Sequence, residues 1–354
     1  MVNVLINGLI LVICLVVAFL LSFDFTKNWI GMARRNGILG KDMNKYDKRE
    51  VSDFGGMMPI VAIITAIFVY IFFNTFVFKN SSQSTELFVI IITVIVASLI
   101  GFFNDVLSMK VTKDKEIFAE FLGRKGRGIG GWKRMLFTLP AAIPLVVMNA
   151  GIDIISLPIL GQVWIGLAYP LVVVTIAVVG ATNGFNLLAG YNGLETGFGI
   201  IMFAGFGVLA LATGQPWLAL IAAIAILALI GFLIFNKFPA KVFPGDSLTF
   251  GIGALVACFA VFGNMEQFAL FLFIPFIIEG FLKWRSKFKA QNFGRPTKDG
   301  YLEPKSKKIY SLTHFFLRFI KKIKPNHKVR ETDVVWALWT LEILLVIIGI
   351  LLVI

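Results

Sequence analysis

The feature that most constrains this chain is a series of apolar segments that are nearly free of charged residues. Most of them are about 17 to 23 residues long, which is the length that an α-helix needs to cross roughly 30 Å of hydrocarbon. The chain of 354 residues is 58% hydrophobic and only 15% charged, which is too apolar for a water-soluble domain. The sequence therefore predicts an all-α, polytopic membrane protein.

Ten segments are predicted to span the membrane, and residues 1–354 are treated as one integral membrane domain. The first segment has no basic residue before it and several after it, which indicates a retained anchor rather than a cleaved signal. Cys14 and Cys258 fall inside spans, so neither a disulfide nor a zinc site is expected. The spans are residues 2–23, 56–78, 87–103, 135–148, 163–181, 197–213, 216–235, 247–263, 268–284 and 333–354.

The basic residues sort the loops between these spans into two groups. One group holds 32 of the 33 Lys and Arg residues if Lys283, at the end of a span, is included, and only Lys79 falls on the other side. This asymmetry predicts a cytoplasmic location for the basic loops and an external location for both termini. The formal charge of +13 would attract anionic headgroups or anionic substrates, and nucleic acid is not needed to explain it. The predicted cytoplasmic loops are 24–55, 104–134, 182–196, 236–246 and 285–332.

Polar residues form four clusters near the cytoplasmic ends of spans. Any one cluster could be a solvated loop, and Asp105 or Asp246 alone could mark a membrane boundary or cap a helix. A helix bundle can bring all four together, however, and clustered polar groups beside a membrane indicate function. The clusters are GKDMNKYDKREVSDFGG (40–56), GFFNDVLSMK (101–110), TNGFNLLAGYNGLETG (182–197) and FNKFPAKVFPGDSLTFG (235–251).

The residue types in these clusters favour phosphoryl chemistry. Carboxylate and amide oxygens suit Mg²⁺, which shares its coordination sphere with substrate phosphates. The chain has neither the Walker sequence GxxxxGK[ST] nor a dinucleotide-binding fingerprint, so an ATP-driven pump is unsupported. Basic residues that could neutralise phosphates are Lys133, Arg134, Lys241 and Arg295.

These clusters resemble the motifs of the polyprenyl-phosphate N-acetylhexosamine-1-phosphate transferase superfamily, which is glycosyltransferase family 4. The resemblance runs from Lys41 to Arg295, and its most specific segments are NLLAGYNGLETG and VFPGDSL. It is strongest to enzymes that transfer GlcNAc 1-phosphate from UDP-GlcNAc to dolichyl phosphate and release UMP. That reaction begins lipid-linked oligosaccharide assembly for N-glycosylation, and the overall pattern favours an archaeal source.

The resemblance also implies roles for individual residues. Asp105, Asn186 and Asp246 would form the catalytic set, in which Asn186 and Asp246 hold Mg²⁺ or Mn²⁺. The residues implied in substrate binding are Asp42, Met43, Asp53, Asn192, Phe243, Lys133, Arg134 and Arg295.

The chain departs from the family pattern in two places and carries one insert. The family usually has two adjacent aspartates where this chain has Asn104 and Asp105, so the acidic role is carried onto Asp105 alone. A His-rich stretch of the family is replaced by QNFGRP, in which Arg295 is the expected diphosphate contact. The basic insert 111–131, containing GRKGRGIGG, is interpreted as a solvated loop rather than a flap over the site.

Other functions stay open at this point. The same chemistry could use another UDP-N-acetylhexosamine or another polyprenyl acceptor. A transporter of an anionic solute is the alternative from a different class, although transporters tend to place binding residues near the membrane midplane in repeated halves. A homodimer is also compatible with the sequence.

Three features outside the clusters complete the sequence predictions. Residues 306–324 have apolar positions at helical spacing among basic residues, as an interfacial helix does. His314 and His327 are expected to be solvated or interfacial. Glu342, midway along the last span, is expected to pair with another helix or to face a cavity.

Overall fold

The computed structural model describes residues 2–108, 132–150, 154–157, 161–164, 166–305 and 308–353. Within these ranges, eight helices are long and apolar enough to cross a membrane, and a helix pair bent by 53° makes a ninth if it counts as one span. The prediction of an all-α polytopic bundle is confirmed. The eight are α1 (Val2–Arg35), α2 (Met57–Phe76), α3 (Ser84–Ser108), η3 with α7 (Tyr169–Val174 and Thr175–Leu187), α8 (Leu194–Ala212), α9 (Pro216–Asn236), α10 (Gly245–Gly263) and α14 (Glu331–Val353), and the bent pair is α11 (Glu266–Leu272) with α12 (Ile274–Arg285).

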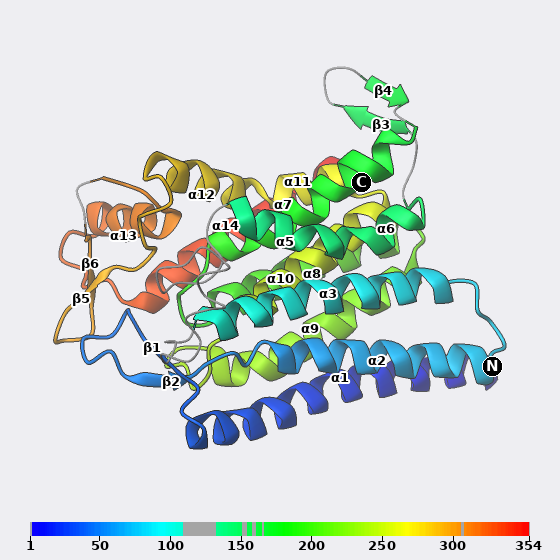
Figure 1. Cartoon of the computed structure of the whole chain (residues 1–354), viewed down its shortest axis with the longest axis horizontal. Helices are drawn as coiled ribbons and strands as arrows, with labels where there is room; N and C mark the ends of the chain where they lie inside the picture. Colours follow the sequence, from blue (N-terminus) through cyan, green and yellow to red (C-terminus); the bar gives the residue numbers. More distant parts are fainter. Residues whose placement is uncertain are drawn as a thin grey trace.

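Helix α10 lies at the centre of the bundle, between α3 and α7 (Figure 1). It is buried along almost its whole length. Two glycines allow the close approach: a Cβ on Gly101 of α3 would overlap the backbone of Asp246, and a Cβ on Gly253 of α10 would overlap the backbone of Ala181. Small residues at such crossings let helices pack tightly where lipid supplies no hydrophobic driving force. The close packing brings the polar ends of α3, α7 and α10 together.

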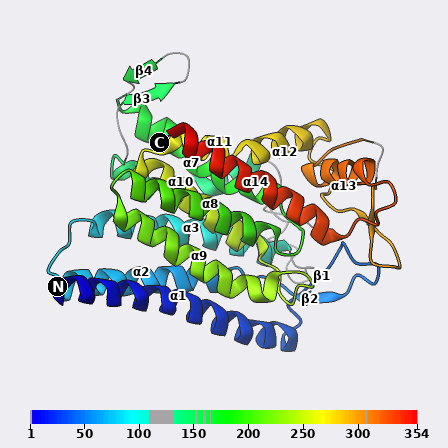
Figure 2. The same cartoon turned by 180° about the vertical axis from the view of Figure 1, so that it is seen from behind.

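The connecting segments divide between the two ends of the bundle, as the basic residues predicted. Both termini and the β3–β4 hairpin lie at one end, whereas the β1–β2 and β5–β6 hairpins and α13 lie at the other (Figures 1 and 2). The hairpins are antiparallel pairs: β1 (Leu39–Lys41) with β2 (Glu50–Ser52), β3 (Ile154–Leu157) with β4 (Gly161–Trp164), and β5 (Arg295–Pro296) with β6 (Leu302–Glu303). Helix α13 is Leu312–Ile323.

The short span predicted at residues 135–148 is helical throughout residues 132–147, but it is not one regular α-helix. It changes type along its length, because Pro140 and Pro144 lack the N–H groups that a regular α-helix needs. The predicted loops at 104–134 and 182–196 also begin too early. Polar residues that face the interior of the bundle do not end a helix, so α3 and α7 both continue past the predicted span ends. The parts of the helical segment 132–147 are α5 (Trp132–Thr138), η2 (Leu139–Ala142) and α6 (Ile143–Val147).

The amphipathic helix predicted at 306–324 is present as α13, but His314 within it is buried, so its predicted exposure is wrong. Burial lowers the pKa of this histidine. His327 is 43% exposed, as expected. Glu342 is fully buried, and neither of its carboxyl oxygens has a hydrogen-bond partner among the described residues. The basic insert at 111–131 lies outside the described residues.

Candidate active site

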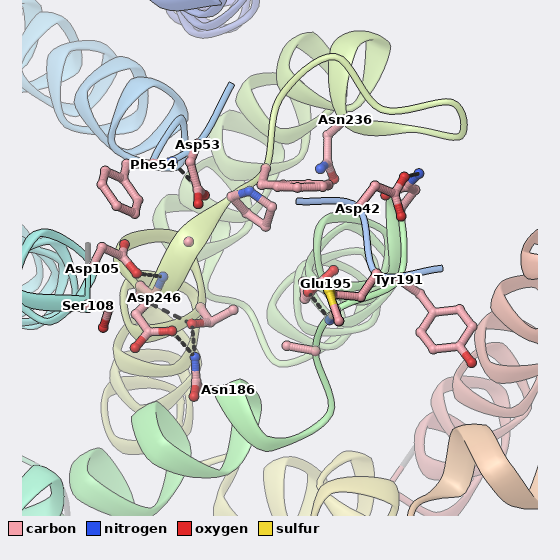
Figure 3. A pocket seen from close by; sticks show the side chains of 18 of the residues that line it. Asp42, Asp53, Phe54, Asp105, Ser108, Asn186, Tyr191, Glu195, Asn236 and Asp246 are labelled. Atoms are coloured by element: carbon pink, nitrogen blue, oxygen red, sulfur yellow. Dashed lines mark hydrogen bonds between the residues drawn. The ribbon is translucent and has the colours of Figure 1, made fainter. Parts of the chain in front are cut away.

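A cavity of about 410 Å³ lies where the ends of α3, α7 and α10 meet the β1–β2 segment (Figure 3). Asp105, Asn186 and Asp246 lie on one side of it, and Asp42, Tyr191 and Asn236 lie on the other. All four sequence clusters contribute to its wall. The lining residues are Lys41, Asp42, Met43, Asp53, Phe54, Asp105, Ser108, Asn186, Ala189, Gly190, Tyr191, Asn192, Glu195, Asn236, Phe243, Pro244, Gly245, Asp246, Thr249 and Phe293.

Helix α3 holds the first turn of α10 by two adjacent side chains. The carboxylate of Asp105 accepts hydrogen bonds from the backbone N–H groups of Asp246 (2.8 Å) and Ser247 (3.2 Å). The first N–H groups of a helix have no partner within it, so this carboxylate serves as their cap. The neighbouring Asn104 amide donates to Oδ2 of Asp246. Asp246 itself is not the cap, and its side chain faces the cavity.

The backbone at Gly245 makes this arrangement possible. Its φ of +67° lies in the left-handed region, which an L side chain rarely adopts. A Cβ at this position would also overlap the carboxylate of Asp105. Glycine is therefore required at position 245 for two reasons, the turn into α10 and the close approach of Asp105.

Helix α7 reaches Asp246 from the opposite side through Asn186. The amide nitrogen of Asn186 donates to Oδ1 of Asp246 (2.7 Å) and to the Thr249 hydroxyl (2.9 Å). Its amide oxygen accepts a hydrogen bond from Nη1 of Arg134 (2.9 Å). Both oxygens of Asp246 are thus bonded to amides, one from α3 and one from α7.

The oxygens of Asp246 and Asn186 fit a divalent cation. Among the described residues, no group of three or more His, Cys, Asp or Glu side chains could hold a metal alone. Mg²⁺ does not need such a group, because it is commonly bound by one or two carboxylates together with waters and substrate phosphates. A half-turn of the Asn186 amide would place its oxygen beside Oδ1 of Asp246, in exchange for the bond that this oxygen accepts from Arg134. The donor set therefore suits Mg²⁺ provided that a phosphate substrate completes it.

The other side of the cavity is built from three segments that are distant in sequence. The amide of Asn192 donates to Oδ2 of Asp42 (3.2 Å). Phe243 is held beside the β2 strand, since its N–H donates to the Ser52 carbonyl (2.8 Å) and its carbonyl accepts from the Gly55 N–H (2.9 Å). Backbone pairing therefore sets the position of the Phe243 ring in the wall.

Asp53 lies in the loop between β2 and α2 and lines the cavity. Burial raises the pKa of its carboxyl to about 6, against the lowering effect of a hydrogen bond from the Phe54 N–H, and the negative charge of Asp246 raises it further. The Asp53 carboxyl therefore takes up a proton near pH 6.

The cavity contains most of the residues that the sequence predicted. Lys133 and Arg295 are exposed and absent from its wall, and Arg134 reaches the site only through Asn186. In QNFGRP, Phe293 faces the cavity instead of Arg295, because Arg295 begins the β5–β6 hairpin that leads away. The predicted residues in the wall are Asp42, Met43, Asp53, Asp105, Asn186, Asn192, Phe243 and Asp246.

Several wall residues were missed by the sequence predictions. Most of them lie inside the predicted clusters, and this position was the only indication in the sequence that they belong to the site. No pattern distinguished them from neighbours that face elsewhere. Those with side chains of chemical interest are Lys41, Ser108, Tyr191, Glu195, Asn236, Thr249 and Phe293.

A second, mostly apolar groove of about 870 Å³ adjoins the cavity and shares Asn186 with it. It runs between α7 and α12, and its outer wall includes the exposed aromatic rings of Phe281 and Trp284. Cationic groups lie along it at Arg134 and Lys283. The lining residues are Arg134, Met135, Gly180, Asn183, Gly184, Asn186, Leu187, Ile277, Gly280, Phe281, Lys283, Trp284, Phe288 and Ala290.

The fold and the site together define a polytopic helical membrane protein with a polar cavity at the ends of its spans and an apolar groove beside it. Comparison with known proteins identifies the family. Residues 87–264 match the sequence profile of glycosyl transferase family 4. The chain belongs to this family, as the motifs predicted.

Individual relatives agree with that assignment. A protein of Saccharolobus solfataricus, provisionally named UDP-N-acetylglucosamine–dolichyl-phosphate N-acetylglucosaminephosphotransferase, is 31% identical over 96% of this chain and 95% of its own length. A protein of Sulfolobus acidocaldarius with the same provisional name is also 31% identical over the same shares. The phospho-N-acetylmuramoyl-pentapeptide-transferase of Halalkalibacterium halodurans is 26% identical over 76% of this chain and 80% of its own length.

Proposed function

We propose that this protein transfers GlcNAc 1-phosphate from UDP-GlcNAc to dolichyl phosphate, or to another polyprenyl phosphate. The products are UMP and a polyprenyl-diphosphate-linked GlcNAc. The observation that carries the proposal is that Asp246 lines the polar cavity and is bonded to Asn186, the residue that this cavity shares with an apolar groove. The provisional names of the two archaeal relatives support this donor and this acceptor.

The polar cavity suits the nucleotide sugar. Asn192 and the backbone around Asp42 and Met43 offer hydrogen-bonding groups for a uracil ring, and the Phe243 ring offers an apolar face beside them. Asp246 lies on the opposite side of the cavity, so a nucleotide that lies across it would bring its diphosphate to this carboxylate. The bond between Asn192 and Asp42 is already formed, so this side of the wall needs little reorganisation when the donor binds.

Asp246 and Asn186 are the residues that would hold Mg²⁺, or Mn²⁺ in its place. The ion would supply positive charge to the diphosphate and to the departing UMP. The chain itself orients Asp246: Asn104 bonds its Oδ2, and Asp105 holds its backbone.

The apolar groove suits the lipid acceptor. Its exposed rings at Phe281 and Trp284 would face the bilayer, and its shared residue Asn186 leads to the cavity. A polyprenyl chain lying in the groove would direct its phosphate toward Arg134, which can neutralise it. Lys283 also lines the groove, but its Nζ already pairs with Glu279 (3.7 Å) and donates to the Ala290 carbonyl (2.9 Å). The lipid would then enter sideways between α7 and α12.

In the proposed reaction, a phosphate oxygen of the lipid attacks the β-phosphorus of UDP-GlcNAc. One P–O bond forms, and the bond from that phosphorus to the bridging oxygen breaks, so UMP leaves with the bridging oxygen. A phosphate monoester with its second pKa near 6 is largely dianionic at neutral pH. The nucleophile therefore needs little help from a base, and Asn104 can replace an aspartate without loss of the chemistry.

Residues of the β1–β2 segment line the cavity, and this segment lies at the same end of the bundle as the β5–β6 hairpin and α13, which are rich in Lys and Arg (Figure 1). The positive charge of these segments supports a cytoplasmic location for the cavity in a multi-pass cell-membrane protein. UDP-sugars would then reach the site from the cytoplasm.

The direct test follows the label from UDP-[³H]GlcNAc into the organic phase when membranes containing the protein are given dolichyl phosphate and Mg²⁺. Label should move into the lipid fraction, and this transfer should require the metal. Added UMP should return the label to the water-soluble nucleotide sugar, and the Asp246→Ala variant should transfer none. The matched control is Asp47→Ala, which removes an exposed carboxylate outside the cavity wall. If no UDP-N-acetylhexosamine donates with any polyprenyl phosphate, and the protein is folded, the proposal is wrong. Uptake of an anionic solute into proteoliposomes would then support the transporter.

A further inference from the structure

Glu331, the first residue of α14, lies outside the family-matched region and is only 2% exposed. Its carboxylate is the meeting point of three donors. Oε1 accepts from the backbone N–H of Asn192 (2.7 Å) and, more weakly, from the amide of Asn44 (3.5 Å). Oε2 accepts from the Lys45 ammonium group. Glu331 does not line the cavity itself.

The donors belong to two loops that carry the proposed uracil-binding wall. Asn192, held by its backbone at Glu331, uses its side chain to bond Asp42. Lys45 also faces Asp42, at 3.5 Å, and the Asn44 amide donates to the Gly190 carbonyl (3.4 Å). One buried carboxylate therefore joins segments that lie about 150 residues apart in the chain.

Helix α14, which carries this carboxylate, packs closely against the start of α8. Two turns after Glu331, the indole N–H of Trp339 donates to the Leu194 carbonyl at the start of α8 (3.1 Å). The Trp339 ring occupies the space beside Gly197, where any Cβ would overlap it. Since α8 begins directly after the Asn192 loop, α14 holds both the loop and the helix that follows.

We propose that Glu331 is a positioning residue that keeps the nucleotide-binding wall assembled without contacting the nucleotide. The inference rests on the proposed function. Without this carboxylate, the Asn192 N–H and Lys45 would lose their shared acceptor in a buried place. The two loops would separate in the free protein, and the nucleotide would have to bring them together on binding. The free energy needed to bring the loops together would therefore weaken nucleotide binding and leave the rate of the transfer step unchanged.

The test uses purified full-length protein in detergent, with UMP binding measured by calorimetry and the transfer kinetics measured with UDP-GlcNAc. Glu331→Ala should weaken UMP binding by about tenfold or more, as expected for loss of charge-assisted hydrogen bonds. The KM for UDP-GlcNAc should rise similarly, with kcat within about twofold of wild type. Glu331→Gln should be intermediate, because its amide oxygen can still accept from the Asn192 N–H.

Asp333→Ala is the matched control, since Asp333 lies in the same helical turn and bonds only Arg330 and His327 among the described residues. It should leave both constants unchanged. If Glu331→Ala does not fold, Glu331→Gln and Lys45→Met carry the test, and combining them should add little to either alone. Unchanged UMP affinity in a folded Glu331 variant, or a fall in kcat alone, would overturn the inference. Failure of the wild type to bind any uridine nucleotide would instead reject the proposed donor, and this inference with it.

Discussion

The carboxylate of Asp105 accepts a hydrogen bond from the backbone N–H of Asp246 over 2.8 Å, so one acid of the site holds the backbone of the other. A second bond, from the Ser247 N–H, uses the other oxygen. Both oxygens of Asp105 are therefore occupied by the first turn of α10. This arrangement favours a supporting role for Asp105, in which it sets the direction of Asp246, over a role as the base.

Substitution of Asp105 separates these roles. Asp105→Asn keeps one acceptor oxygen for the α10 N–H groups, so it should retain a measurable part of the activity. Asp105→Ala keeps none, and kcat should fall by about 10- to 100-fold, given 1.5–3 kcal/mol for a hydrogen bond to a charged group. Transfer assays across pH would compare them. Equal and complete loss of activity in both variants would show that the carboxylate acts as the base.

Asn104→Asp tests the departure from the family pattern. The amide donates to Asp246, whereas a carboxylate would repel it. The variant should therefore unfold at a lower temperature without metal, with a loss of about 1–3 kcal/mol. Added Mg²⁺ should recover part of the loss, because a cation neutralises the new pair. Thermal unfolding in detergent with and without Mg²⁺ measures both effects, and an equal loss in both conditions would contradict the explanation.

The raised pKa of Asp53 predicts that the stability of the protein depends on pH. Its pKa is raised from 3.8 to about 6, so the folded protein keeps a proton on it that the unfolded chain releases. The stability that this proton provides is complete below about pH 4 and is lost as the pH rises through about 6. Asp53→Asn should therefore be more stable than wild type at pH 7.5, by roughly 2–3 kcal/mol, and equal to it near pH 4.

Thermal unfolding between pH 4 and pH 8 checks this expectation. Asp47→Asn is the control, since Asp47 is exposed in the neighbouring turn between β1 and β2. A stability gain for Asp53→Asn that does not change with pH would show that the charge of Asp53 is not its cause.

Gly180 offers a way to narrow the apolar groove without disturbing the fold. It lines the groove, and an added Cβ would meet no atom within 4 Å. Gly180→Leu should raise the KM for the polyprenyl phosphate by about tenfold and leave the KM for UDP-GlcNAc unchanged, because the lost binding is confined to the acceptor. Gly31→Leu, on α1 and equally unobstructed, is the control. Equal effects on both substrates would argue against this groove as the acceptor site.

The sequence predicted the family and most of the cavity because the motifs lie at the ends of spans on one side. It expected an ordinary span at residues 135–148, because a hydropathy window does not register that Pro140 and Pro144 disturb the regular α-helix there. It placed Arg295 at the site because nothing local shows that the chain turns away into a hairpin after Phe293. It expected His314 to be exposed because its neighbours are basic and interfacial.

What the sequence determined by itself is the class of this protein: long uncharged segments require a lipid-embedded helical bundle, and the basic loops set its two sides. What only the tertiary structure decided is which groups meet. Asp105 caps α10, Asn186 bonds Asp246, and Glu331 supports Asn192 from 139 residues away. The physical reason is that these contacts depend on helix rotation and close glycine crossings, which hydrophobic pattern and charge do not specify.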